Sequence, residues 1–157
     1  MRRLARELGR QLQHRGYRLA TAESCTGGWL AQAVTSIAGS SAWFERGFVT
    51  YSNAAKEEML GVKPETLARF GAVSAETAIG MAEGALMHSR SDISVAITGI
   101  AGPEGSSEDK PVGTVWFAWA GGGRPPVAVC EHFEGGRDTV RRRAVETALS
   151  GLIERLQ

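Results

Sequence analysis

The sequence is poor in the residues that bind metals or form cross-links. Its 157 residues include two cysteines and three histidines. Cys25 and Cys130 lie far apart, without the short spacing of a zinc or redox motif, and His14, His88 and His132 show no metal-ligand spacing either. The sequence therefore predicts no metal site, no cofactor and free thiols in a reducing compartment.

An excess of charge of one sign is also missing. The chain has 18 Lys and Arg against 17 Asp and Glu, a net charge of +1. This balance gives no reason to expect a nucleic acid partner. No apolar run approaches the roughly 18 residues of a membrane span, so we expect a cytoplasmic protein whose partner is a small molecule.

The composition is that of an ordinary folded protein, with 43% hydrophobic and 22% charged residues. The length suits one domain over residues 1–157. Apolar periodicity predicts helices near residues 4–12, 29–36, 53–60, 64–70, 75–92 and 137–156, and strands near 17–21, 47–51, 93–98, 113–119 and 126–133. This order predicts an α/β fold with a mixed, largely parallel sheet between layers of helices.

Two glycine-containing loops follow predicted strands, at residues 26–28 and 99–102. Backbone N–H groups in such loops can bind an anion, and open α/β sheets bind ligands at the carboxyl ends of their strands. Neither loop matches the glycine pattern of a dinucleotide-binding or a P-loop protein. Both are equally compatible with structural turns.

Four arginines, at positions 137 and 141–143, lie at the start of the last predicted helix. Cations there oppose the helix dipole by roughly 0.3–1 kcal/mol each unless an anion is bound nearby. Arg137 and Arg141, one turn apart, are the candidate anion-binding pair. The alternative is a solvated basic face.

The sequence offers two candidate nucleophiles. Cys25 lies before a helix, but no cysteine-enzyme motif surrounds it, and a packed thiol is the favoured interpretation. Ser41, Tyr51 and Lys56 fall within one short stretch and could form a compact cluster. Lys56 has two neighbouring glutamates, however, so an exposed helix lysine is the alternative.

Taken together, these motifs resemble the family of CinA carboxy-terminal domains and stand-alone nicotinamide-nucleotide amidases. The residues that carry the resemblance are 21–28, 38–53, 71–74, 98–103 and 110–115. The resemblance spans nearly the whole chain. It implies a three-layer α/β/α sandwich, a homodimer, and hydrolysis of nicotinamide mononucleotide to nicotinate mononucleotide and ammonia in the recycling of NAD.

The resemblance also implies roles for single residues. Ser41 is expected to attack the carboxamide, Lys56 to act as its base, and Tyr51 to orient them, while Arg137 is expected to contact phosphate or ribose. The expected substrate-binding residues are Ser24, Thr26, Gly27, Thr98, Gly99, Gly102, Arg137 and Arg141. Two alternatives stay open: a nucleotide-binding module without catalysis, and an amidase that uses Cys25 on another substrate.

Overall fold

The computed structural model describes the whole chain, residues 1–157. The helices are α1 (Arg2–Arg15), α2 (Trp29–Thr35), the short 3-10 helix η1 (Ser40–Ala42), α3 (Asn53–Leu60), α4 (Pro64–Phe70), α5 (Ala75–Met87) and α6 (Arg137–Arg155). The strands are β1 (Leu19–Glu23), β2 (Phe44–Val49), β3 (Ile93–Gly99), β4 (Thr114–Gly121) and β5 (Arg124–His132).

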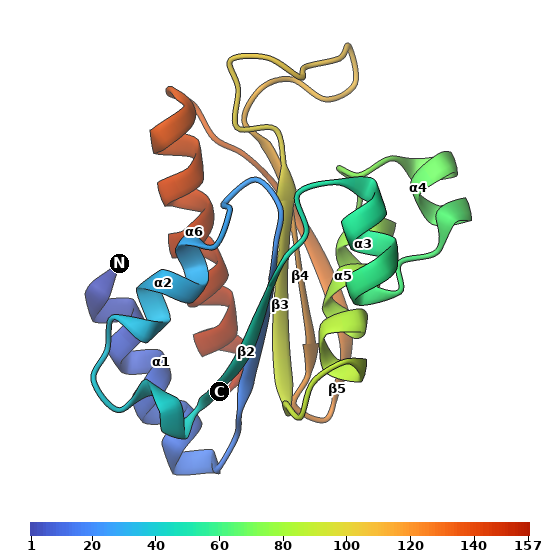
Figure 1. Cartoon of the computed structure of the whole chain (residues 1–157). Coiled ribbons are helices and arrows are strands. Elements are labelled where there is room, and N and C mark those ends of the chain that lie inside the picture. The colour runs from blue at the N-terminus through green and yellow to red at the C-terminus, as the bar shows by residue number, and fades with distance from the viewer.

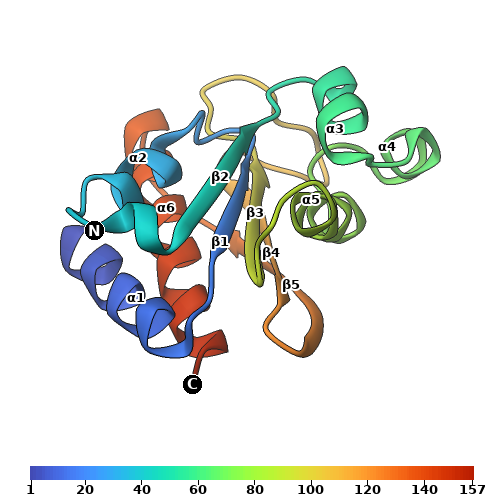
Figure 2. The ribbon, with the colours of Figure 1, turned by 60° about the horizontal axis from the view of Figure 1, so that its bottom comes forward.

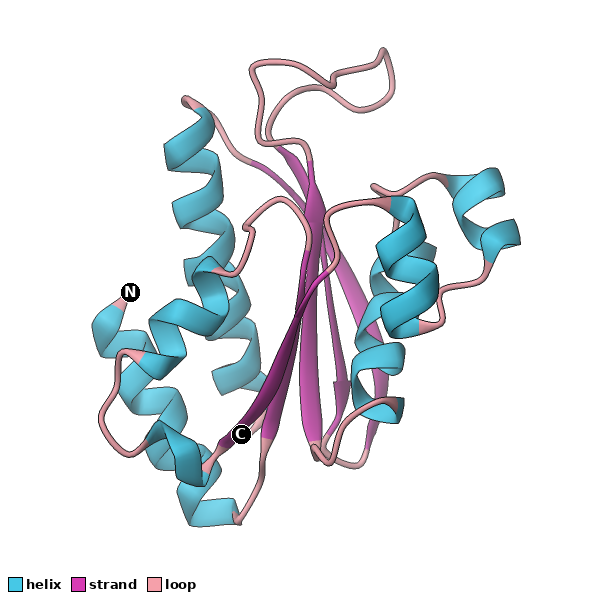
Figure 3. Ribbon diagram, viewed as in Figure 1, coloured by secondary structure: helices cyan, strands magenta, loops and turns pink.

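The strands form one mixed sheet in the order β2-β1-β3-β4-β5. β1 pairs in parallel with β2 and β3, whereas β4 and β5 are antiparallel additions. Helices α1, α2 and α6 cover one face, and α3, α4 and α5 lie on the other (Figures 1 and 2). The predicted α/β/α sandwich is confirmed, and Figure 3 shows its three layers with the sheet seen nearly edge-on.

Side-chain size differs between the two faces of the sheet. Large side chains, among them Leu19, Ile97 and Phe117, belong to the core beneath α1, α2 and α6. The opposite core contains five alanines from the central strands: Ala20, Ala22, Ala96, Ala118 and Ala120. Because successive strand residues point to opposite faces, this alternation gives α5 a shallow surface on which to pack closely.

Two strands start earlier than the sequence pattern indicates. β2 begins at Phe44 because its backbone pairs with β1 from Leu19 onward. β5 begins at Arg124 and includes Pro125 and Pro126. Proline cannot donate a ladder hydrogen bond, which is tolerated here because β5 is an edge strand.

The chain turns back across the sheet between β2 and β3. The connection from β1 to β2 runs over one face through α2, and the connection from β2 to β3 runs over the other through α3, α4 and α5 (Figure 1). The direction of winding therefore reverses at β1, and such a switch point opens a crevice at the carboxyl ends of the strands.

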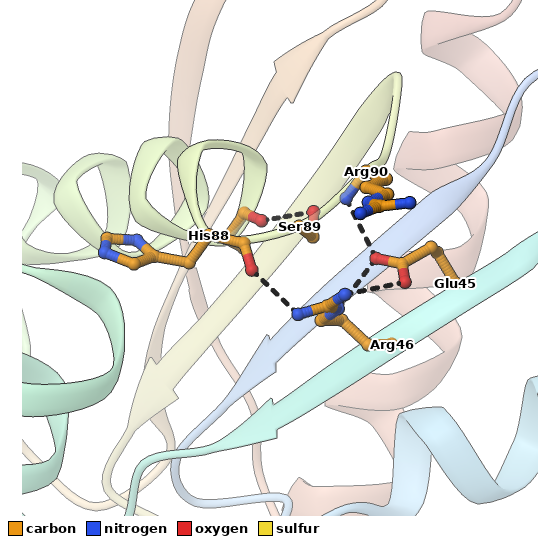
Figure 4. Close-up of polar contacts among 6 residues, drawn as sticks. Glu45, Arg46, His88, Ser89 and Arg90 are labelled. Carbon is orange, nitrogen blue, oxygen red and sulfur yellow. Dashed lines mark hydrogen bonds and ion pairs between the residues drawn. The ribbon is translucent and has the colours of Figure 1, made fainter.

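The opposite end of the sheet is closed by a polar network (Figure 4). The Glu45 carboxylate accepts hydrogen bonds from Arg46 Nε at 2.8 Å and from the Arg90 backbone N–H at 3.0 Å. Arg46 also donates to the His88 carbonyl at 3.1 Å. The bonds from Arg46 and Arg90 lower the pKa of Glu45. The network as a whole joins β2 to the turn between α5 and β3.

A groove of about 870 Å³ lies between β5 and α6 and is lined by Val127, Val129 and Gly151, among others. It is separate from the crevice at the switch point. No helix has the length and apolar character that crossing a membrane needs. The side chains of His, Cys, Asp and Glu form no group of three that could hold a metal ion.

Two glycines of α5 differ in what surrounds them, and they give a matched test of this packing. A Cβ at Gly84 would collide with the Leu60 carbonyl oxygen, whereas one at Gly80 would meet Val62 at 3.7 Å, an ordinary contact. We expect Gly84→Ala to lower the free energy of unfolding by about 1–3 kcal/mol. Gly80→Ala should raise it by up to about 1 kcal/mol, because alanine favours a helix. Urea unfolding measures both changes. Equal effects of the two substitutions would contradict the close approach of α5 to the Leu60 carbonyl.

Candidate functional site

Three connections meet above the carboxyl ends of β1, β2 and β3, at the top of Figure 1. Ser24 follows β1, and its backbone N–H donates to the Ile97 carbonyl of β3 at 2.9 Å. The Thr50 N–H, just after β2, donates to the Glu23 carbonyl at 2.8 Å. These bonds extend the sheet by one residue and fix Ser24 beside Thr50.

Lys56 reaches this crevice from α3 on the other face of the sheet. Its Nζ lies 3.1 Å from Ser24 Oγ and donates to the Thr50 carbonyl at 2.9 Å. The hydroxyl of Ser52 caps α3 by accepting the Ala55 N–H at 3.0 Å, which fixes where the helix begins. The short turn after β2 thus carries the lysine back to the residue that follows β1.

The amine of Lys56 is buried without a carboxylate partner. The residue is 1% exposed, and no salt bridge includes it. Burial lowers the pKa of Lys56 below its ordinary value, because a low-dielectric environment disfavours the charged form. The interpretation of Lys56 as an exposed helix lysine is wrong, and a neutral amine beside a serine hydroxyl can act as a base.

Glu23 ends β1 and is fully buried. Its carboxylate accepts hydrogen bonds from Thr26 Oγ1 at 2.6 Å and from the backbone N–H groups of Leu30 at 2.9 Å and Ala31 at 3.0 Å. Three donors compensate the desolvated charge. Glu23 therefore fastens the turn that carries Ser24 to the first turn of α2.

Two arginines of α6, Arg137 and Arg141, make different contacts at the crevice. Arg137 donates to the Tyr51 hydroxyl at 3.0 Å and to the Gly102 carbonyl at 2.8 Å, and its side chain lies at the exposed mouth. Arg141 is half-buried and donates to the carbonyls of Cys25 and Thr26. The two residues of the predicted anion-binding pair therefore lie apart: Arg137 is at the mouth, and Arg141 is bound to the turn after Ser24.

The remaining predicted substrate-binding residues lie in the same connections. Thr98 is buried and donates to the Ala72 carbonyl at 2.7 Å, which ties β3 to the segment before α5. Gly27 and Gly102 have φ of 57° and 83°, a region that favours glycine. A Cβ on Gly99 would lie 2.8 Å from the Thr114 carbonyl. Each glycine is thus accounted for by backbone geometry, and a contact with substrate stays a prediction.

The structure places Ser41 away from the other predicted catalytic residues. Ser41 is exposed in η1, before β2, whereas Tyr51 and Lys56 follow β2. The six residues of β2 at about 3.3 Å each separate the two ends by roughly 20 Å. The predicted compact cluster of Ser41, Tyr51 and Lys56 does not form, because β2 separates Ser41 from the other two. Ser24 is the serine that contacts Lys56.

Cys25, the other candidate nucleophile, packs inward. It is 6% exposed and belongs to the core beneath α1, α2 and α6. Burial raises the pKa of the Cys25 thiol to about 11, so the reactive thiolate is scarce at neutral pH. The geometry agrees with the packed thiol that the sequence favours.

Sequence reasoning missed the pairing of Ser24 with Lys56 and the role of Glu23. The resemblance was carried onto Ser41, which lies near Lys56 along the chain, but proximity in a parallel sheet follows strand order. One usable signal is present: the strand ends in an acidic residue, and a serine follows it directly before a glycine turn. A fully buried strand that ends in glutamate indicates a carboxylate with dedicated hydrogen-bond donors.

Comparison with known proteins supports the resemblance to this family. Residues 1–156 match the model of the CinA C-terminal domain. The chain is 57% identical over 149 residues to the nicotinamide-nucleotide amidohydrolase PncC of Escherichia coli K12, covering 95% of this chain and 90% of that protein. The PncC of Pseudomonas putida is 48% identical over 151 residues, which cover 96% of this chain and 94% of that protein.

A solved structure is similarly close. The competence/damage inducible protein CihA of Agrobacterium tumefaciens superposes with a TM-score of 0.96 at 49% identity, covering 99% of this chain and 95% of that one. Sequence and fold agree over almost the full length of the relatives. The chain belongs to the CinA C-terminal domain family.

Proposed function

We propose that the chain hydrolyses the carboxamide of nicotinamide mononucleotide, giving nicotinate mononucleotide and ammonia, with Ser24 as nucleophile and Lys56 as base. The observation that carries the proposal is the 3.1 Å separation between Ser24 Oγ and the buried Lys56 Nζ. The names of the two PncC relatives supply the substrate.

The first half of the reaction transfers the acyl group to the enzyme. Neutral Lys56 takes the proton of Ser24 as the serine oxygen bonds to the carboxamide carbon. Lys56 then gives this proton to the departing nitrogen. The C–N bond breaks, ammonia leaves, and an ester joins the nicotinoyl group to Ser24.

The second half consumes water. Lys56 takes a proton from a water molecule, whose oxygen attacks the ester carbon. The ester C–O bond breaks, and the proton on Lys56 returns to Ser24. One water is consumed and one ammonia released, and the product is a carboxylic acid that ionises at neutral pH. The same lysine therefore serves both halves.

The surroundings of Lys56 support its role as a base. It has no carboxylate partner, and burial lowers its pKa. The substrate carries a cationic pyridinium, which would lower the pKa of a nearby lysine further. Tyr51 and Arg137 lie at the mouth of the crevice, and the Arg137 guanidinium suits the phosphate of the nucleotide. A homodimer and a role in NAD recycling stay predictions from the family resemblance.

Ammonia release from nicotinamide mononucleotide tests the proposal directly. With a chelator present, we expect wild type to be active and Ser24→Ala and Lys56→Ala to lose about 10³-fold or more in kcat, as enzymes do when a nucleophile or its base is removed. Ser41→Ala is the matched control and should keep its activity. Loss of activity in Ser41→Ala but not in Ser24→Ala would overturn the assignment. An inert wild type that binds the nucleotide would favour a binding module.

The burial of Cys25 predicts selective alkylation. In native protein at pH 8, iodoacetamide should modify the half-buried Cys130 and leave Cys25 unmodified, because the Cys25 thiol is inaccessible and has a raised pKa. Peptide mass spectrometry locates the label, and unfolded protein, in which both thiols react, is the control. Rapid native labelling of Cys25 with loss of ammonia release would instead favour a cysteine nucleophile.

The lowered pKa of Lys56 predicts a pH dependence of stability. Between that pKa and the ordinary value of 10.5, the unfolded chain binds more protons than the folded chain, so the free energy of unfolding rises with pH. Lys56→Met lacks this group. Urea unfolding from pH 7 to 10 should show stability rising more in wild type than in Lys56→Met. Parallel profiles would mean that Lys56 keeps an ordinary pKa.

A further inference from the structure

The side chain of Arg141 donates hydrogen bonds to backbone carbonyls of the turn that follows Ser24. Its Nε donates to the Cys25 carbonyl at 3.0 Å, and its NH2 group donates to the Thr26 carbonyl at 3.2 Å. The guanidinium also lies over the ring of Trp29, 5.4 Å from the ring centroid. A planar guanidinium can hold two carbonyls and a ring at once, which an ammonium cannot.

This contact fixes the direction of the Thr26 backbone N–H. In a trans peptide the N–H points opposite to the carbonyl of the same unit. Holding the Cys25 carbonyl therefore aims the Thr26 N–H away from Arg141. Neither the Thr26 N–H nor the Cys25 N–H donates a hydrogen bond within the chain, and the Gly27 N–H holds the Ser24 carbonyl at 3.0 Å, which sets the direction of the Cys25 N–H.

Glu23 holds the same turn from its other side. It accepts the Thr26 hydroxyl at 2.6 Å, while Arg141 holds the Thr26 carbonyl. Glu23 and Arg141 form no salt bridge with each other. Glu23 and Arg141 therefore both bind the turn rather than each other, and together they fix the side chain and the carbonyl of Thr26.

We infer that Arg141 is a positioning residue that holds the Thr26 N–H, next to the Cys25 N–H, toward the substrate's developing oxyanion. The inference rests on the proposed function. The N–H of the residue after a nucleophile commonly contributes to an oxyanion hole. Arg141 is half-buried against the Trp29 ring, whereas Arg137 is exposed at the mouth, so the phosphate contact falls to Arg137.

The kinetic test compares three α6 arginines. Arg141→Lys keeps the charge without the planar fork, and we expect kcat to fall about 10²-fold, as for the loss of one oxyanion donor. Measured in the Ser24→Ala background, its Kd for nicotinamide mononucleotide should stay within about threefold. Arg137→Ala should mainly weaken binding. Arg142→Ala is the control, because this exposed side chain pairs with Glu146, and it should match wild type.

A second readout does not need activity. In ¹H–¹⁵N spectra of the ligand-free protein, Arg141→Lys should shift or broaden the Cys25 and Thr26 amide signals without changing the thermal unfolding, and Arg142→Ala should leave them in place. Unchanged amide signals overturn the inference. The inference is also overturned if Arg141→Lys keeps the wild-type kcat, whether or not it loses affinity for the nucleotide. A wild type that releases no ammonia refutes the proposed function, while the amide signals still report on the positioning.

Discussion

A lysine amine buried without a counter-charge is the constraint on which the rest of the site depends. Water would stabilise the ammonium form of Lys56, and the protein offers it one carbonyl and one hydroxyl instead. This arrangement requires the register in which Glu23 of β1 lies beside Val49 of β2. A slip of one residue would turn alternate side chains to the other face. The site therefore depends on the parallel pairing of β1 and β2 as well as on Lys56.

The charged residues around the turn after β1 interact with backbone more than with each other. Glu23 accepts two backbone N–H groups, and Arg141 donates to two carbonyls. A direct ion pair would have neutralised both without ordering the intervening residues. Because each charge instead binds peptide groups, the turn has a fixed shape before any ligand arrives. Such preorganisation is what an enzyme needs where charge develops during a reaction.

Periodicity predicted most of the fold, including the helix bounds of α3 and α4 and the layered α/β architecture, because burial dictates apolar spacing. The strand ends were less accurate, since hydrogen bonding to a neighbour decides where β2 and β5 start. The two glycine loops predicted at the carboxyl ends of strands lie there beside the candidate site, but the contact between Ser24 and Lys56 was not predicted. Ser41 lies 15 positions from Lys56 and Ser24 lies 32, yet strand order brings the more distant serine into contact. The burial of Lys56 had no local signal, because adjacent glutamates suggest an exposed helix face.

The connection from β3 to β4 passes the crevice as an exposed loop, residues 103–109. Lys110 anchors its far end by donating to the Phe70 carbonyl at 3.0 Å. Doubling the length of such a loop costs only about 0.6 kcal/mol in closure entropy. Ser24, Lys56 and Arg141 all lie on other segments. Insertions and deletions in this one loop can therefore alter which nucleotide or amide is preferred. The residues that carry out the reaction stay in place while that preference diverges among related proteins.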